Sequence, residues 1–141
     1  MEGVAAEEVQ ARLAGVRTML AAGGRYDPPG LFAGEPRAGV ADLLEEMTAT
    51  ARPASLRAQM SVMAETDQRD LRPHIAVATL LIWGDSDTRS PLGVARQFKD
   101  AIPHAALVVI PGAGHVSNLE QPGAFNEAVR AFCREHPPGE R

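Results

Sequence analysis

The 141-residue sequence has little of several features on which whole classes of protein depend. It holds one cysteine, Cys133, so no disulfide can form within the chain, and a reducing compartment, the cytoplasm, is the expected location. Its 14 basic residues include a single lysine and stand against 18 acidic residues, so we expect no nucleic-acid partner. No stretch approaches the roughly 20 uncharged apolar residues that cross a bilayer, and no basic-then-apolar secretory signal opens the chain, so we expect no membrane partner.

What the sequence does contain differs between its two halves. In residues 1–70, apolar side chains recur at steps of three and four, which places them on one face of a helix. Three short amphipathic helices are predicted there. One carries the stripe Val9, Leu13, Val16 and Leu20, one runs from about Val40 to Ala51, and one follows Pro53 with the stripe Leu56, Met60 and Met63.

From Leu71 onward the pattern becomes that of a parallel sheet. Two short apolar runs, residues 79–83 and 106–110, are bounded by turn residues and predict buried strands. The segment between the runs has the apolar spacing of a helix that covers the sheet. Residues 71–141 therefore predict a strand-helix-strand unit followed by a last helix, and the fold class is α/β.

The ends of these two helices carry recognisable signals. Ser90 is expected to cap the covering helix, with Pro91 in its first turn and Pro103 beyond its end. The last helix is expected from about Pro122 to His136. Cys133 lies within it and is expected to be a small buried thiol.

Chemistry-bearing residues follow both predicted strands. A crossover between parallel strands is right-handed, so the loops after the two strands emerge at the same edge of the sheet, where α/β proteins bind ligands. The first loop is Gly84-Asp85-Ser86-Asp87 and the second is Gly112-Ala113-Gly114-His115. A carboxylate can therefore meet an imidazole there, which is the pairing that orients a histidine base.

These two loops, in this order, resemble the C-terminal end of the α/β-hydrolase superfamily. The resemblance rests on the runs TLLIWGDSD at 79–87 and PGAGHVSNLEQP at 111–122, and it is strongest to the enol-lactone hydrolase and esterase-like branch. It implies that residues 71–141 are the C-terminal part of that fold, two parallel strands with flanking helices, and that residues 1–70 form a helical lid. It also implies that Asp87 is the acid and His115 the base of a catalytic triad.

The chain departs from the family pattern at the nucleophile. Family members carry a serine in a Gly-x-Ser-x-Gly turn ahead of the acid and base, and none of the five serines here has that setting: Ser55, Ser61, Ser86, Ser90 and Ser117. The oxyanion donors of the family would likewise precede Met1. The expectation is a truncated hydrolase of a small ester or lactone, inactive alone and active only if an N-terminal half completes it.

Other interpretations stay open at this point. The chain could be a non-catalytic protein-interaction module derived from a hydrolase, and its exposed strand edge could support self-association. Asp87 could simply close its own turn, and His115 could be structural. Asp85 is expected to be a turn or helix-facing carboxylate. Arg89 could bind a substrate carboxylate or face solvent. No metal is expected, because the four histidines and the nearby acids lack ligand spacing. No cofactor is expected, because the glycines at 112 and 114 lack the third glycine and the immediate helix of a dinucleotide site.

Overall fold

The computed structural model describes residues 14, 30–49, 52, 54–55, 58–59, 62 and 66–137. Apart from Ala14, the predicted helix at 9–20 lies outside the described residues, and the one after Pro53 is described at only a few positions. The chain divides into two compact units, Met1–Pro28 with Ala38–Arg69 and Pro29–Arg37 with Asp70–Arg141. Residues 29–37 thus cluster with the second unit. The assignment of residues 1–70 as a lid stays a prediction.

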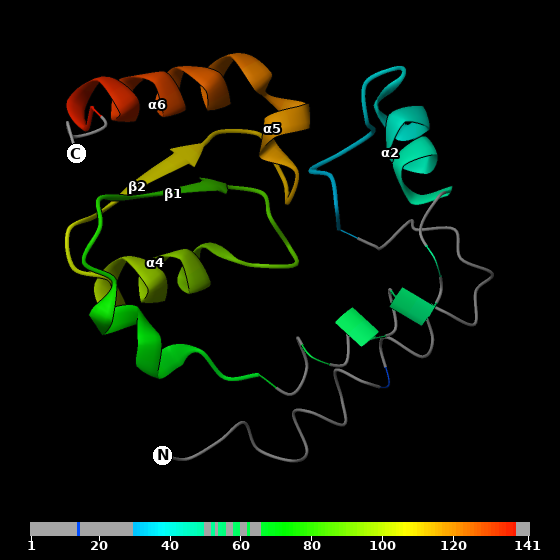
Figure 1. Ribbon diagram of the computed structural model, residues 1–141. Helices are drawn as coiled ribbons and strands as arrows, with labels where there is room; N and C mark the ends of the chain where they lie inside the picture. The colour runs from blue at the N-terminus through cyan, green and yellow to red at the C-terminus, as the bar shows by residue number, and fades with distance from the viewer. Residues whose placement is uncertain are drawn as a thin grey trace. The chain divides into compact units, whose positions relative to one another are not determined.

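In the first unit, helix α2 spans Val40–Ala49 (Figure 1), where the sequence predicts a helix. It begins with a hydrogen bond from Leu43 N to Gly39 O of 3.0 Å. Asp42 lies in its first turn, where a carboxylate is favoured by the partial positive charge of the helix N-terminus. The prediction of a helix starting at Val40 is confirmed.

The second unit is built on two parallel strands, β1 at Thr79–Gly84 and β2 at Ala105–Ile110. Their register runs from Thr79 opposite Ala105 to Gly84 opposite Ile110. Short helix η1, Arg69–His74, precedes β1. Both strands were predicted from their apolar runs, and their parallel pairing confirms the strand-helix-strand unit.

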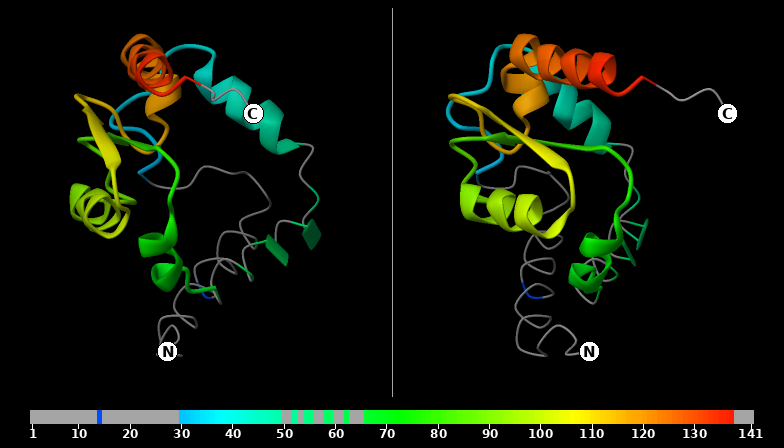
Figure 2. Two further views of the ribbon diagram at one scale, coloured as in Figure 1. Left: turned by 60° about the vertical axis from the view of Figure 1, so that its left-hand side comes forward. Right: turned by 90° about the vertical axis from the view of Figure 1, so that its left-hand side faces the viewer.

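Three helices flank this sheet. Helix α4, Leu92–Ala101, connects the strands on one face, while α5, Ser117–Glu120, and α6, Pro122–Glu135, lie on the other (Figure 1 and Figure 2). The ring of Phe98 on α4 lies 6.1 Å from the ring of Trp83 on β1, measured between centroids. A helix on each face is the layering that an apolar parallel sheet requires.

The core of the second unit is small. Its buried apolar residues are Leu31, Ala95, Ile102, Ala105, Ile110 and Ala113. The strands themselves are only half-buried along most of their length, and Val109 is 39% exposed. The prediction of buried strands is wrong for this chain because the described sheet has two strands, so each of them keeps one edge without a neighbour.

Two local predictions are corrected, and one short helix was not predicted. Helix α4 begins at Leu92 with Pro91 at the N-cap position and no side-chain cap bond, so Pro91 is not in the first turn and Ser90 is not the cap. The backbone N–H of Ser90 donates to Asp87 instead. Helix α5 lies between the second strand and the last helix, where no element was predicted. Cys133 is exposed on α6 and is not a buried thiol.

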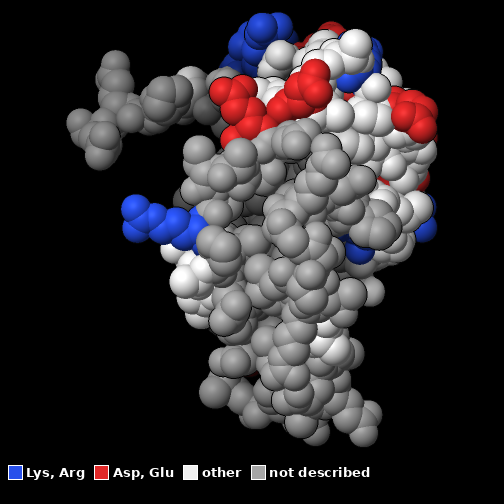
Figure 3. All heavy atoms as spheres, turned by 90° about the vertical axis from the view of Figure 1, so that its right-hand side faces the viewer, with Lys and Arg blue, Asp and Glu red and all other residues white. Residues whose placement is uncertain are grey.

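The described surface carries both charge signs. Figure 3 shows one face of the molecule, and on its described part acidic and basic side chains lie near one another. Among the described residues, no helix combines the length and the apolar character needed to cross a bilayer.

Candidate functional site

The loops that follow β1 and β2 are tied to each other at the carboxyl edge of the sheet. Asp85 N donates to Ile110 O at 3.1 Å, and Ser86 N donates to Ala113 O at 3.0 Å. The Asp85 carboxylate also accepts a hydrogen bond from Gly112 N at 2.8 Å. Asp85 therefore does more than close its own turn, because it connects the first loop to the second.

Gly84 allows the two loops to approach this closely. A Cβ atom built on Gly84 would overlap the carbonyl oxygens of Ala113 and Gly114. No side chain larger than hydrogen fits there without moving the backbone that leads to His115. The close approach of the two loops therefore requires a glycine at the end of β1.

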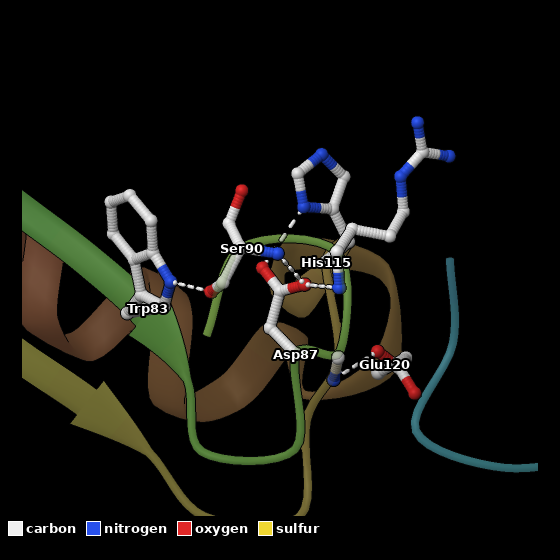
Figure 4. Close-up of polar contacts among 7 residues, drawn as sticks. Trp83, Asp87, Ser90, His115 and Glu120 are labelled. Atoms are coloured by element: carbon white, nitrogen blue, oxygen red, sulfur yellow. Dashed lines mark hydrogen bonds and ion pairs between the residues drawn. The ribbon is translucent and has the colours of Figure 1, made fainter. Parts of the chain in front are cut away.

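Asp87 is the most constrained side chain of the site. Its residue is 8% exposed. Its Oδ1 atom accepts hydrogen bonds from Arg89 N and Ser90 N, both at 2.9 Å, and its Oδ2 atom lies 2.9 Å from His115 Nδ1 (Figure 4). Asp87 therefore closes a turn and faces the imidazole at the same time, so the two interpretations of this residue are compatible.

The side chain of Trp83 stabilises the same turn. Trp83 Nε1 donates to Ser90 O at 2.5 Å (Figure 4). The backbone of Ser90 is thus held on one side by the β1 side chain and on the other by Asp87. These hydrogen bonds fix the position of the Asp87 carboxylate without the help of a ligand.

His115 points its ring toward Asp87 but keeps an open side. Its side chain is 40% exposed, against 5% for the side chain of Asp87. With an ionised Asp87 as acceptor, Nδ1 carries the hydrogen, and Nε2 presents a lone pair. The ring can therefore accept a proton at Nε2, and the carboxylate stabilises the imidazolium that forms.

Residues 30–37, called the strap below, run beside the loop that carries His115. Leu31 O accepts hydrogen bonds from His115 N at 3.0 Å and from Val116 N at 3.3 Å. Glu120 connects both segments, because Oε1 accepts from Ala33 N at 2.8 Å and Oε2 accepts from Gly114 N at 2.6 Å. Figure 4 shows Glu120 beside the loop that carries His115. Sequence reasoning missed Glu120 and the strap, since no local pattern signals contacts between residues so far apart.

The other candidates are not part of this pair, although Arg89 contacts it through its backbone. Arg89 donates its backbone N–H to Asp87, and Arg89 is an exposed residue. His104 lies at the turn before β2, at the opposite end of that strand, and the ring of His136 packs on Phe132 with centroids 4.5 Å apart. Within the described residues, no group of three His, Cys, Asp or Glu side chains is arranged to hold a metal ion.

Comparisons with known proteins agree with this architecture. A model of the alpha/beta hydrolase family matches residues 3–128. A thermophilic esterase from Thermogutta terrifontis superimposes with a TM-score of 0.79 and 26% sequence identity, over 95% of this chain and 52% of the esterase. The predicted family resemblance and fold class are thereby confirmed.

Two curated relatives are named as hydrolases of esters or lactones. A pimeloyl-(acyl-carrier protein) methyl ester esterase from Vibrio vulnificus is 29% identical over 81 residues, which cover 57% of this chain and 32% of the relative. A 3-oxoadipate enol-lactonase 2 from Acinetobacter baylyi is 36% identical over 72 residues, which cover 51% of this chain and 27% of the relative. The chain spans about half the length of the solved esterase and matches a third or less of each curated relative.

Proposed function

Because this chain belongs to the alpha/beta hydrolase family, we propose that Asp87 and His115 are the acid and base of a Ser-His-Asp site that hydrolyses a small carboxylic ester or lactone. The observation that carries the proposal is the 2.9 Å contact between His115 Nδ1 and a buried Asp87 carboxylate. The names of the relatives, a methyl ester esterase and an enol-lactonase, support the substrate class.

In the proposed mechanism, His115 first accepts a proton and then donates it. As a serine oxygen attacks the ester carbonyl, Nε2 takes the hydroxyl proton, and the tetrahedral intermediate forms. The imidazolium then gives that proton to the leaving alkoxide, so an alcohol departs and an acyl-serine remains. A water molecule attacks the acyl-serine in the same way, which releases the carboxylic acid and restores the serine.

The attacking serine has to come from elsewhere in this proposal. The 141 residues contain no Gly-x-Ser-x-Gly sequence, and Ser86 and Ser90 take part in the turns around Asp87. We therefore propose that the nucleophile and the oxyanion donors belong to polypeptide outside these 141 residues. The chain alone is then expected to be inactive, because it holds an acid and a base but no attacking group.

A complementation experiment tests this proposal. The chain is purified alone and together with the part of the Thermogutta terrifontis esterase that it does not cover. Hydrolysis of p-nitrophenyl acetate is then measured. We expect the buffer rate for the chain alone and a rate above that of either part for the pair.

The variant His115→Ala should remove the activity of the pair, and His74→Ala, a change at an exposed histidine outside the site, should retain it. Activity that survives His115→Ala would contradict the proposed role of the imidazole. Ester hydrolysis by the isolated chain would contradict the proposed source of the nucleophile.

A second candidate function, a module that binds another protein, is favoured by one observation. Both described strands have an unpaired edge, and Val109 on β2 is 39% exposed. An open strand edge can pair with a second chain, including another copy of this one. Sedimentation of the isolated chain, read together with the complementation experiment, separates the two candidates. A defined oligomer supports the protein-binding module. A monomer that becomes active when the esterase part is added supports the hydrolase.

A further inference from the structure

Glu120 is placed between two segments that both bear on His115. One carboxylate oxygen accepts the backbone N–H of Gly114, next to His115 in the chain, and the other accepts that of Ala33 in the strap. Glu120 is half-buried and Gly114 is buried, so water does not readily replace the bond to Gly114, whereas the bond to Ala33 is exposed. Both are charge-assisted, which makes them stronger than bonds between neutral groups.

Residues 111–116, called the base loop below, connect β2 to α5. The strap and Glu120 together accept three successive N–H groups of this loop. Gly114 N goes to Glu120, and the N–H groups of His115 and Val116 go to Leu31 O. The strap is also pressed against the loop, because a Cβ atom on Gly114 would lie 2.6 Å from Ala33 N and 2.7 Å from the carbonyl carbon of Phe32. The backbone position of His115 therefore depends on contacts with the strap and with α5.

We propose that Glu120 is a positioning residue for His115. It keeps the base loop against the strap, and in that position the imidazole Nδ1 reaches Asp87. The consequence for catalysis rests on the proposed function, whereas the geometric consequence concerns this chain alone. Glu120 acts through the backbone N–H groups of Gly114 and Ala33 and not through the side chain of Asp87 or His115.

The hydrogen bonds of Asp87 make this role distinguishable from general support of the fold. Asp87 is held by Arg89 N and Ser90 N, and Ser90 by the indole of Trp83, none of which involves Glu120. Loss of Glu120 should therefore separate the imidazole from Asp87 while the turn around Asp87 stays formed. A residue that merely stabilised the fold would affect both together.

The test measures the tautomer of His115 in the purified chain by long-range ¹H–¹⁵N correlation spectra, with His115→Ala to assign its signals. In the native chain we expect the Nδ1–H form to dominate. In Glu120→Ala the ratio of the Nδ1–H to the Nε2–H form should fall by roughly ten-fold, the change expected when a hydrogen bond to a carboxylate is lost. The indole N–H signal of Trp83 should stay in place.

Two further variants complete the experiment. Glu120→Gln keeps one acceptor oxygen and should lower the ratio by less, whereas Glu127→Ala, at an exposed position on α6, should leave it unchanged. An unchanged ratio in Glu120→Ala, or global unfolding of both Glu120 variants, would overturn the positioning role. A native chain without an Nδ1–H preference would instead refute the Asp87–His115 pair on which the proposed function depends.

Discussion

Asp87 and His115 meet at one hydrogen bond, yet they are held in opposite ways. The Asp87 side chain is 5% exposed and is held by backbone N–H groups only two and three residues away in the sequence. The His115 side chain is 40% exposed, and its backbone is positioned by the strap. Asp87 is thus placed by local chain geometry and His115 by tertiary contacts, so the two should respond differently to substitution.

The largest loss of stability is expected from Asp87→Ala. This change leaves the N–H groups of Arg89 and Ser90 without their acceptor and removes the partner of His115. We expect a decrease of about 3 kcal/mol in the free energy of unfolding, because two part-buried hydrogen bonds to a charged acceptor are lost together with the contact to His115. Urea unfolding followed by the fluorescence of Trp83, the single tryptophan, measures it.

Asp87→Asn is the matched control for that change. Its Oδ1 atom can still accept from Arg89 N and Ser90 N, while its amide group faces His115 Nδ1 and reverses the hydrogen bond. We expect a cost of about 1 kcal/mol, with the activity of the complemented pair reduced by about 10³-fold or more. Equal destabilisation by the two variants would contradict the importance of the turn.

The next largest effect is expected at the contact between the base loop and the strap. Gly114→Ala would place a methyl group 2.6 Å from Ala33 N and 3.1 Å from Glu120 Oε2, so the strap has to move. We expect a loss of about 2 kcal/mol in the free energy of unfolding, measured by urea titration.

Gly93→Ala provides the comparison for this substitution. A Cβ atom there meets nothing within 4 Å, and Gly93 lies in helix α4, where alanine is the better helix former. We expect it to raise stability by about 0.5 kcal/mol. If both glycine variants behaved alike, the strap would carry no constraint on the base loop.

A small loss of stability is expected from His115→Ala. The imidazole is partly exposed and makes one side-chain hydrogen bond, and its removal lets water reach Asp87 Oδ2. We expect a loss of about 1 kcal/mol or less in the same urea titration, although the complemented activity should disappear. A loss as large as that of Asp87→Ala would remove the contrast between the two residues.

Much of the second unit could be predicted from the sequence. The runs at 79–83 and 106–110 predicted both strands, and the loops after them predicted that Asp87 and His115 would face each other. These predictions succeeded because strand periodicity, turn residues and the handedness of the crossover are local or general constraints. Their proposed catalytic roles stay predictions.

The failures share a different cause. The exposure of Cys133, the half-buried strands and the start of α4 at Leu92 each depend on what packs against a segment or competes for its backbone groups. A periodic apolar pattern says which face could be buried, but not whether a neighbour is there to bury it.

The sequence by itself determined the order of strands and helices from Thr79 onward and the edge at which a carboxylate and an imidazole would emerge, because these depend on a few neighbouring residues. Only the tertiary structure decided how the imidazole is held. Glu120 and Ala33 are 87 positions apart, and their hydrogen bond exists only after the strap has folded against the loop that follows β2. No periodicity or motif in the chain encodes a contact of that separation.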